Sequence, residues 1–114
     1  MPYLAVKTNI SISDDDKKAL LATLSSVAAE ELGKPERYVM VLVEDNAAML
    51  FAGSDAPLAY LEMKSIGLPE AITPDLSTAL CNVVHKQLGI NKDRVYIEFS
   101  DAPRKMWGWD GKTF

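Results

Sequence analysis

The residue of this sequence whose type and position best suit a catalytic role is the proline directly after the first methionine. Cells usually remove an initiator methionine that precedes a small residue, and loss of Met1 would leave Pro2 with a free secondary amine. A solvated α-amino group titrates near about 7.7–8.0, and apolar surroundings or a nearby lysine lower that pKa. A neutral amine can serve as a general base near neutral pH. Pro2 is therefore a candidate catalytic base, although proline at position 2 has no obligatory role by itself.

Metal and nucleophile chemistry find little support in the remaining residue types. The only histidine, His85, has no second histidine or paired cysteine beside it, so we expect no metal site. A serine triad would need that same histidine next to an acid and a nucleophile, and no local motif supports one. Cys81 is the only cysteine, which excludes an internal disulfide and a cysteine metal centre. The scattered glycines form no phosphate-binding loop.

Length and charge narrow the class of protein further. The chain has 114 residues, 48% of them hydrophobic, which fits one domain over residues 1–114. Its net charge is -4 and no basic stripe is visible, so nucleic acid is an unexpected partner. The start of the chain lacks the pattern of a signal peptide, and no segment has the roughly 20 apolar residues of a membrane helix. We expect a cytoplasmic protein without membrane contact, for which unconventional secretion stays open.

An internal repeat organises the chain. Leu4–Thr8 resembles Leu61–Ser65, and the segment around Arg37 resembles the segment around Arg94. Lys7 and Lys64 are 57 residues apart, and so are Arg37 and Arg94. A shared offset at both ends of a unit indicates duplication. We place the two units at about residues 2–45 and 58–101.

The first unit reads as strand, helix, strand. Residues 2–8 form a short apolar strand, and Ser13 followed by acidic residues predicts the start of a helix. The apolar face of that helix consists of Leu20, Leu24, Val27 and Ala28, with Leu21 and Leu32 beside it. Gly33 should end the helix, and Pro35 should prevent its resumption. Residues 38–43 are strongly β-forming and predict a strand.

The second unit repeats the order. Residues 58–65 predict a strand, and Thr73 followed by Pro74 predicts a helix that Thr73 caps. The helix has an apolar face of Leu76, Leu80, Val83 and Val84 and ends at Gly89, before a closing strand over residues 94–99. We also expect a short extra strand at about 48–52 and a compact aromatic tail at 105–114.

Two such units predict an α+β fold in which a duplicated β-α-β unit builds a four-stranded core sheet with two helices on one face. The other face of the sheet then lacks a cover within the chain. Two helices are too few to hide all of the apolar residues on the strands, which are Val6, Met40, Leu42, Met63, Val95 and Ile97. We therefore expect partner subunits to cover that open face.

Five sequence blocks resemble the family of macrophage migration inhibitory factor and D-dopachrome tautomerase, in its order and spacing. These blocks are Met1–Asn9, Gly33–Pro35, Ser65–Gly67, Asp93–Ile97, and Gly108–Trp109 with the terminal Thr113–Phe114. Each block is weak alone, and together they span nearly the whole chain. The resemblance implies a homotrimer with active sites at subunit interfaces. It also implies cofactor-free keto–enol tautomerisation of phenylpyruvate, 4-hydroxyphenylpyruvate and dopachrome esters.

The resemblance also implies roles for individual residues. Pro2 matches the catalytic base, Lys34 the lysine that binds the substrate carboxylate, and Ile66 a backbone contact in the pocket. The aromatic pocket positions are matched by Tyr38, Trp109, Phe114 and, from the neighbouring subunit, Tyr96. Without the resemblance, Lys34 would be a helix-end lysine favoured by the helix dipole, and Tyr96 and Trp109 would be packing residues.

Three departures from the family pattern bear on activity. Leu58–Leu61 replaces a cysteine pair, which excludes a thiol–disulfide activity. Glu98 stands in place of an active-site asparagine, where a carboxylate would repel an acidic substrate or pair with Lys34. Trp107 replaces a smaller aliphatic pocket residue and would narrow the pocket. We therefore expect phenylpyruvate tautomerase activity weaker than that of the mammalian protein.

Two other functions remain open at this stage. The first is a cytokine-like or host-modulating binding protein with incidental tautomerase activity, since one fold serves both roles in the family. A relative that acts on halogenated or other acids is less favoured, because such enzymes add paired arginines to the proline site. The physiological substrate and the removal of Met1 are not determined by the sequence.

Overall fold

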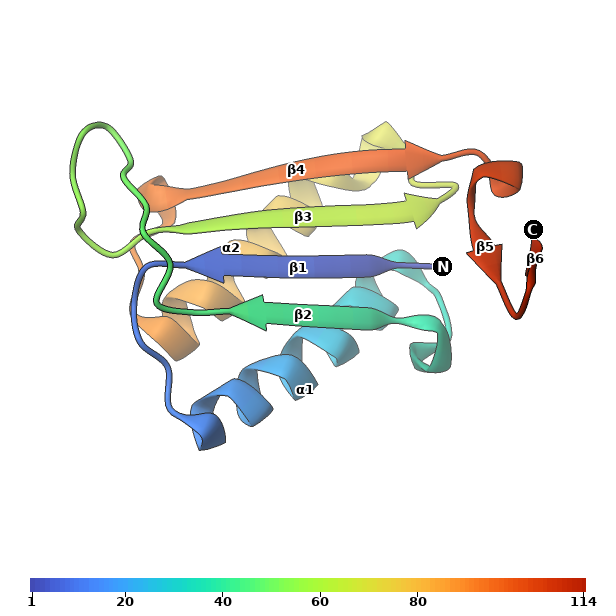
Figure 1. The fold of residues 1–114 in the computed structure, drawn as a ribbon. Helices are drawn as coiled ribbons and strands as arrows, with labels where there is room; N and C mark the ends of the chain where they lie inside the picture. The colour runs from blue at the N-terminus through green and yellow to red at the C-terminus, as the bar shows by residue number, and fades with distance from the viewer.

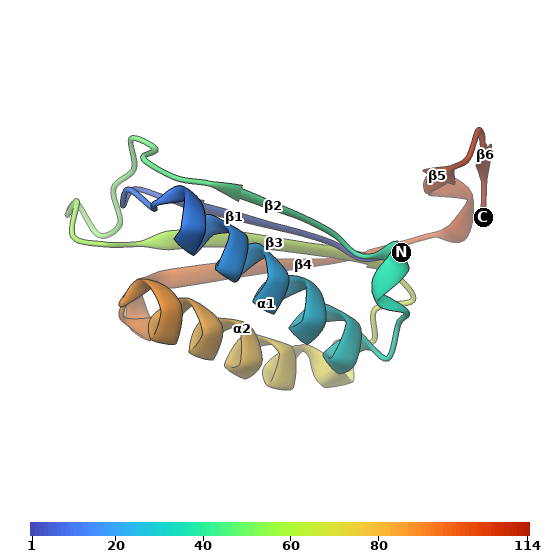
Figure 2. The same ribbon diagram turned by 90° about the horizontal axis from the view of Figure 1, so that it is seen from below.

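The computed structural model describes residues 1–114 as a four-stranded sheet with two helices on one face and a small C-terminal hairpin (Figures 1 and 2). The main elements are β1 (Tyr3–Thr8), α1 (Asp14–Leu32), β2 (Met40–Glu44), β3 (Ala59–Ile66), α2 (Thr73–Leu88), β4 (Val95–Ala102), β5 (Gly108–Trp109) and β6 (Lys112–Thr113). Short 3₁₀ turns lie at η1 (Glu36–Tyr38), η2 (Glu70–Ile72), η3 (Lys92–Arg94) and η4 (Arg104–Met106). The predicted α+β fold is confirmed.

The sheet is mixed, with the strand order β2-β1-β3-β4. β1 runs parallel to β2, β3 runs parallel to β4, and the two central strands β1 and β3 are antiparallel. Each parallel pair is joined through one helix, so the two halves of the chain have the same order of elements. The N-terminus and the β5–β6 hairpin consequently lie at the same end of the sheet (Figure 1).

The first helix begins and ends where the sequence predicts. The Ser13 side chain accepts a hydrogen bond from the Asp16 amide at 3.2 Å, which satisfies one of the free amide groups of the first turn. Gly33 ends α1 in the left-handed conformation, with φ 62°. The Lys34 amide then donates to the Ala29 carbonyl at 3.0 Å. This fixes the backbone of Lys34 at the end of the sheet that carries the N-terminus.

Three predicted boundaries are wrong. β2 begins at Met40 instead of residue 38, because the Tyr38 amide donates to the Pro35 carbonyl and closes the turn η1. Thr73 does not cap α2, since its hydroxyl donates to the Glu70 carbonyl of the preceding turn. β4 continues past residue 99 to Ala102, because it pairs along the whole of β3.

The predicted extra strand at 48–52 is also absent. In this segment only Phe51 pairs, and its partner is Ser54 across a tight turn. Ala52 and Gly53 both have positive φ values, 53° and 72°. The segment pairs with no strand of the sheet, so no ladder forms there.

The hydrophobic core lies between the helices and one face of the sheet. Leu4 and Val6 of β1 and Leu61 of β3 are fully buried against the helices. The helices contribute Leu20, Leu24, Ala28, Leu76, Leu80 and Val84. Burying each large side chain stabilises the fold by about 2 kcal/mol. This packing holds the end of β1, and with it Pro2, against the sheet.

The open face of the sheet is less apolar than expected. Val6 and Met63 are fully buried on the helix face, and Val95 and Ile97 pack against the same core. Side chains alternate along a strand, so the open face carries their neighbours. These are Tyr3, Lys7, Met40, Leu42, Tyr60, Glu62, Lys64, Tyr96 and Glu98. Of the six apolar strand residues, only Met40 and Leu42 lie there, both exposed. The two helices therefore leave some of the six uncovered, as expected, but the open face is mixed in character.

Arg94 holds the loop between β2 and β3 in place. Its guanidinium donates hydrogen bonds to the carbonyls of Phe51, Ser54, Ala56 and Pro57, at 2.9–3.3 Å. A planar guanidinium presents five donors in a fixed geometry, which an ammonium group does not reproduce.

We expect Arg94→Lys to lower the free energy of unfolding by about 1–3 kcal/mol, because several loop carbonyls lose their donors. Denaturant unfolding measures the change. Arg104→Lys is the matched control, since the exposed Arg104 donates no hydrogen bond within the chain and should unfold like the parent. Equal midpoints for the two variants would show that the Arg94 contacts do not stabilise the loop.

Neither helix is long and apolar enough to cross a membrane.

Candidate functional site

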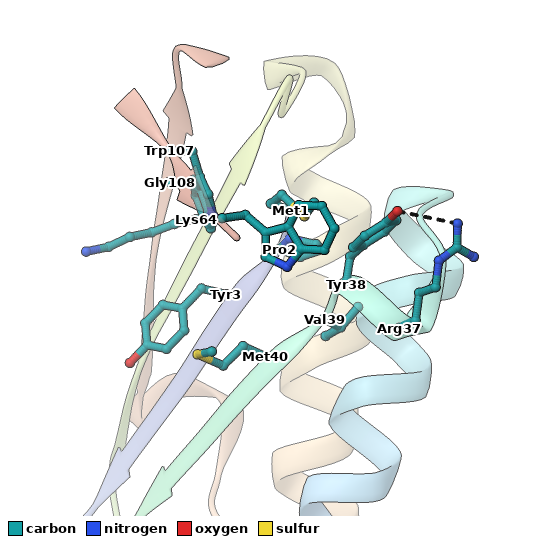
Figure 3. A pocket seen from close by; sticks show the side chains of 11 residues that line it. Met1, Pro2, Tyr3, Arg37, Tyr38, Val39, Met40, Lys64, Trp107 and Gly108 are labelled. Carbon is teal, nitrogen blue, oxygen red and sulfur yellow. Dashed lines mark hydrogen bonds between the residues drawn. The ribbon is translucent and has the colours of Figure 1, made fainter. Parts of the chain in front are cut away.

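A cavity of about 410 Å³ lies at the end of the sheet where β1 begins. It is lined by Met1, Pro2, Tyr3, Arg37, Tyr38, Val39, Met40, Lys64, Trp107, Gly108 and Trp109. In Figure 3, Pro2 lies between Tyr38 of η1 and the Trp107–Gly108 segment. Residues from both ends of the chain therefore meet around Pro2.

Pro2 is held by the sheet. It is buried, and its carbonyl accepts a hydrogen bond from the Met40 amide at 3.0 Å, which extends the pairing of β1 with β2. Proline has no amide hydrogen in the chain, so its nitrogen gives nothing to the ladder. The ladder fixes the residue through its carbonyl and leaves the nitrogen available at the cavity.

A second cavity of about 240 Å³ adjoins the first. Its lining consists of Met1, Lys34, Pro35, Tyr38, Ile66, Arg104 and Phe114. Met1 and Tyr38 line both cavities. Loss of Met1 should therefore join the two spaces and expose the Pro2 nitrogen at their junction.

The environment of the N-terminus disfavours a positive charge there. Burial, and then the positive charge of Lys34, hold the pKa of the Met1 α-amino group below its ordinary value. Pro2 is more deeply buried than Met1. The same two causes should act on the Pro2 amine once Met1 is gone.

The two cavities are lined by four cationic residues, Lys34, Arg37, Lys64 and Arg104, and by no Asp or Glu side chain. This differs from the chain as a whole, whose net charge is -4. Figure 3 shows Arg37 and Lys64 pointing away from Pro2. Arg37 donates to the Tyr38 hydroxyl at 3.5 Å, and the Lys64 amine lies 3.5 Å from the Glu62 carboxylate. The cavities suit an anion, for which Lys34 and Arg104 are the free charges.

Aromatic rings form one wall. Trp109 meets Tyr38 edge-on and stacks with Phe114, with 5.9 Å between ring centroids in each pair. The Phe114 amide donates to the Trp107 carbonyl at 3.2 Å and closes the C-terminal hairpin. Packing of this kind between rings favours a flat apolar ligand group beside them. The predicted compact aromatic tail is thus present and contributes to the site.

Six of the predicted site residues other than Pro2 line these cavities: Lys34, Ile66, Tyr38, Trp107, Trp109 and Phe114. Tyr96 and Glu98 do not. Tyr96 is 65% exposed on the open face, where its ring contacts Phe51 at 4.6 Å. Glu98 accepts a hydrogen bond from the Tyr60 hydroxyl at 3.1 Å and is not paired with Lys34. A role for these two across a subunit interface stays a prediction.

The pKa of the Tyr60 phenol depends on its hydrogen-bond partner Glu98. Partial desolvation, followed by the hydrogen bond and the negative charge of Glu98, raises the pKa of Tyr60 above its ordinary value.

The single histidine, His85, has a structural contact, because its Nδ1 lies 3.0 Å from the Ile90 carbonyl just beyond α2. Neither Tyr60 nor His85 lines the cavities around Pro2.

Arg104 is the main residue that the sequence reasoning missed. It lies two residues after Ala102, which pairs with Ile66 across β4 and β3. The resemblance pointed to Ile66, so the strand that pairs beside Ile66 was the available signal. Using it required the register of the sheet, which the sequence alone does not determine.

Comparisons with known proteins agree over the whole chain. The sequence model of the family described as macrophage migration inhibitory factor (MIF) matches residues 1–114. The chain is 37% identical to a homolog of that factor from Brugia malayi, over 100% of this chain and 99% of the relative. It is 34% identical to the factor from Mus musculus, with the same coverage.

Solved structures give the same result. The homologue from Prochlorococcus marinus has a TM-score of 0.93 and 41% sequence identity, over 98% of both chains. The factor from Trichinella spiralis has a TM-score of 0.90 and 32% identity, over 98% of this chain and 99% of that one.

Proposed function

Since the chain belongs to the macrophage migration inhibitory factor family, we propose that it is a phenylpyruvate-type keto–enol tautomerase. Pro2 is its general base once Met1 is removed. The main support is that Pro2 lines an aromatic cavity, and that this cavity shares Met1 and Tyr38 with a second one lined by Lys34 and Arg104. A flat ring and a carboxylate on the same small acid match these two cavities.

The proposed reaction moves one proton and needs no cofactor. In the enolising direction, the neutral Pro2 amine takes a proton from the carbon next to the keto group. The electron pair of that C–H bond becomes the enol double bond. The protonated Pro2 amine then gives its proton to the former carbonyl oxygen, directly or through water, which restores the neutral base. Ketonisation reverses these steps. A positioned base of this kind contributes about 10²- to 10⁴-fold to the rate.

The binding residues act on the two ends of the substrate. Lys34 attracts the carboxylate and stabilises negative charge that develops on the enolate, in a cavity without an Asp or Glu side chain. Ile66 lines the same cavity. The rings of Tyr38, Trp109 and Phe114 pack against the apolar end, and Trp107 narrows that space.

We propose a homotrimer, in which Tyr96 and Glu98 of one subunit complete the site of the next. This is supported by the exposure of both residues on the open sheet face. A carboxylate in that place would repel an acidic substrate, so the proposed activity is weaker than that of the mammalian protein.

The test of this function is a steady-state assay with phenylpyruvate and 4-hydroxyphenylpyruvate, on protein whose intact mass shows that Met1 is absent. Turnover that requires Pro2 supports the proposal. A protein that binds these acids without turnover would instead favour a binding function.

Lys34→Gln tests the electrostatic part of the site. The base must be neutral, so kcat/KM rises with pH through its pKa. Burial and then Lys34 lower the pKa of the Met1 amine, and the same charge should act on the Pro2 amine, so removing Lys34 should move the inflection to higher pH. We expect kcat/KM at neutral pH to fall by about 10- to 100-fold, since a charged hydrogen-bond donor to the substrate is also lost.

The measurement is the pH profile of kcat/KM for phenylpyruvate. Lys18→Gln is the matched control, because Lys18 is exposed on α1 and lines neither cavity. An inflection that stays in place, or moves to lower pH, in Lys34→Gln would contradict the role given to Lys34.

A further inference from the structure

Arg104 is placed beside Lys34 by elements that are distant in sequence. It begins the turn η4, where the Trp107 amide donates to the Arg104 carbonyl at 3.3 Å. The strand before it is fixed as well, because Asp101 Oδ1 accepts a hydrogen bond from the Leu68 amide at 3.0 Å. This contact joins the end of β4 to the loop that follows Ile66. The backbone of Arg104 is thus held at the second cavity.

No carboxylate of the chain neutralises these two cations. The chain has two ion pairs, Lys17 with Asp45 and Lys64 with Glu62, and neither includes Lys34 or Arg104. Arg104 also makes no side-chain hydrogen bond within the chain, in contrast to Arg37 and Arg94. Two free positive charges from separate elements therefore line one cavity of about 240 Å³.

One carboxylate needs only one of these charges. The family resemblance assigns the substrate carboxylate to Lys34 and leaves Arg104 without a partner. A guanidinium binds a carboxylate through two parallel hydrogen bonds, which gives both geometry and affinity. Lys34 is half-buried and Arg104 is exposed at the rim of the same cavity, where its guanidinium can reach an anion that Lys34 attracts.

We propose that Arg104 binds a second carboxylate, so that the chain prefers keto–enol acids that carry two carboxylates over those that carry one. This rests on the proposed function and names the substrate class of the same site. Arg104 is a specificity-determining residue in this scheme, and Pro2 remains the base. The two anionic groups lie in the cationic cavity, and the carbon that exchanges its proton lies next to Pro2.

The experiment compares two rigid probes, benzoate and isophthalate, which differ by one carboxylate. Their affinities are measured by calorimetric titration of protein whose mass shows that Met1 is absent. We expect isophthalate to bind at least about tenfold more tightly than benzoate, the effect of one further charged contact. Arg104→Gln should reduce this preference to about twofold or less, and Arg104→Lys should retain part of it.

Lys105→Gln is the matched control. It makes the same charge change on the same turn, and Lys105 lines neither cavity. The preference for isophthalate should persist in this variant. Unfolding midpoints of all variants verify that each one is folded.

Three results would overturn the inference. The first is a parent protein with no preference for isophthalate over benzoate. The second is an Arg104→Gln variant that keeps the preference. The third is a Lys105→Gln variant that loses the preference as fully as Arg104→Gln does. If Arg104 pairs with an acid of a neighbouring subunit, Arg104→Gln lowers the oligomer mass and leaves the preference intact, which also overturns it.

Binding and turnover separate this inference from the function on which it rests. An Arg104-dependent preference in a protein without Pro2-dependent turnover would contradict the tautomerase proposal alone. Pro2-dependent turnover of phenylpyruvate without any preference for isophthalate would contradict the role of Arg104 alone.

Discussion

Pro2→Gly should lower kcat/KM for phenylpyruvate by about 10²- to 10⁴-fold, the contribution of a positioned general base. Glycine is small enough for Met1 removal to continue, so the variant keeps a free α-amine. That amine is primary and no longer held by a ring, so its basicity and its position both change. The carbonyl of residue 2 still accepts from the Met40 amide, and the fold should persist.

The measurement is steady-state turnover with mass and circular dichroism checks on each protein. Pro74→Ala is the matched control, because Pro74 is an exposed proline in the first turn of α2 and lines neither cavity. It should leave turnover as in the parent. Turnover of Pro2→Gly within a fewfold of the parent would show that Pro2 is not the base.

The same variant separates the two main functional hypotheses. An enzyme loses its turnover with Pro2. A binding protein with an incidental pocket would keep its partner, because the side chains on the surface are unchanged. Retained partner binding together with lost turnover would favour the second hypothesis.

Protein that retains Met1 should have no measurable turnover. An amide nitrogen in a peptide bond has no basic lone pair, so Pro2 would lose its function while every side chain stayed in place. Met1 also lines both cavities and would obstruct their junction. The effect should therefore equal or exceed that of Pro2→Gly.

Separating the two forms by intact mass and assaying each provides the measurement. An alanine inserted between Met1 and Pro2 provides a stable version, since processing then leaves one residue ahead of Pro2. This extended chain should bind substrate weakly and turn none of it over. Turnover by the extended chain at the parent rate would exclude the Pro2 amine from the chemistry.

The local signals in the sequence predicted most of the fold. Ser13 and Gly33 marked the ends of α1 because capping depends on the residue type and its immediate neighbours. The periodicity of apolar residues along each strand and helix is also a local property, and it predicted two helices on one face of a four-stranded sheet. The fold class, the two-fold repetition of elements and the family all followed from such local patterns.

Boundaries that depend on tertiary pairing were less accurate. Residues 48–52 have strand-like composition, yet they pair with no strand of the sheet. The open face is mixed in character because Val6 and Met63 point to the helices. Shifting a strand by one residue reverses every side chain, and the sequence alone did not determine which parity faced the core.

The sequence by itself determined Pro2 as the candidate base, because the identity and position of one residue decide whether a free secondary amine forms. It also indicated Lys34, Ile66 and the aromatic pocket positions through the family blocks. Only the tertiary structure placed Arg104 in the same cavity as Lys34 and showed that no Asp or Glu side chain lines the cavities. The physical reason is the register of β3 with β4, a long-range pairing that brings Ala102 to Ile66 and sets Arg104 at the same cavity.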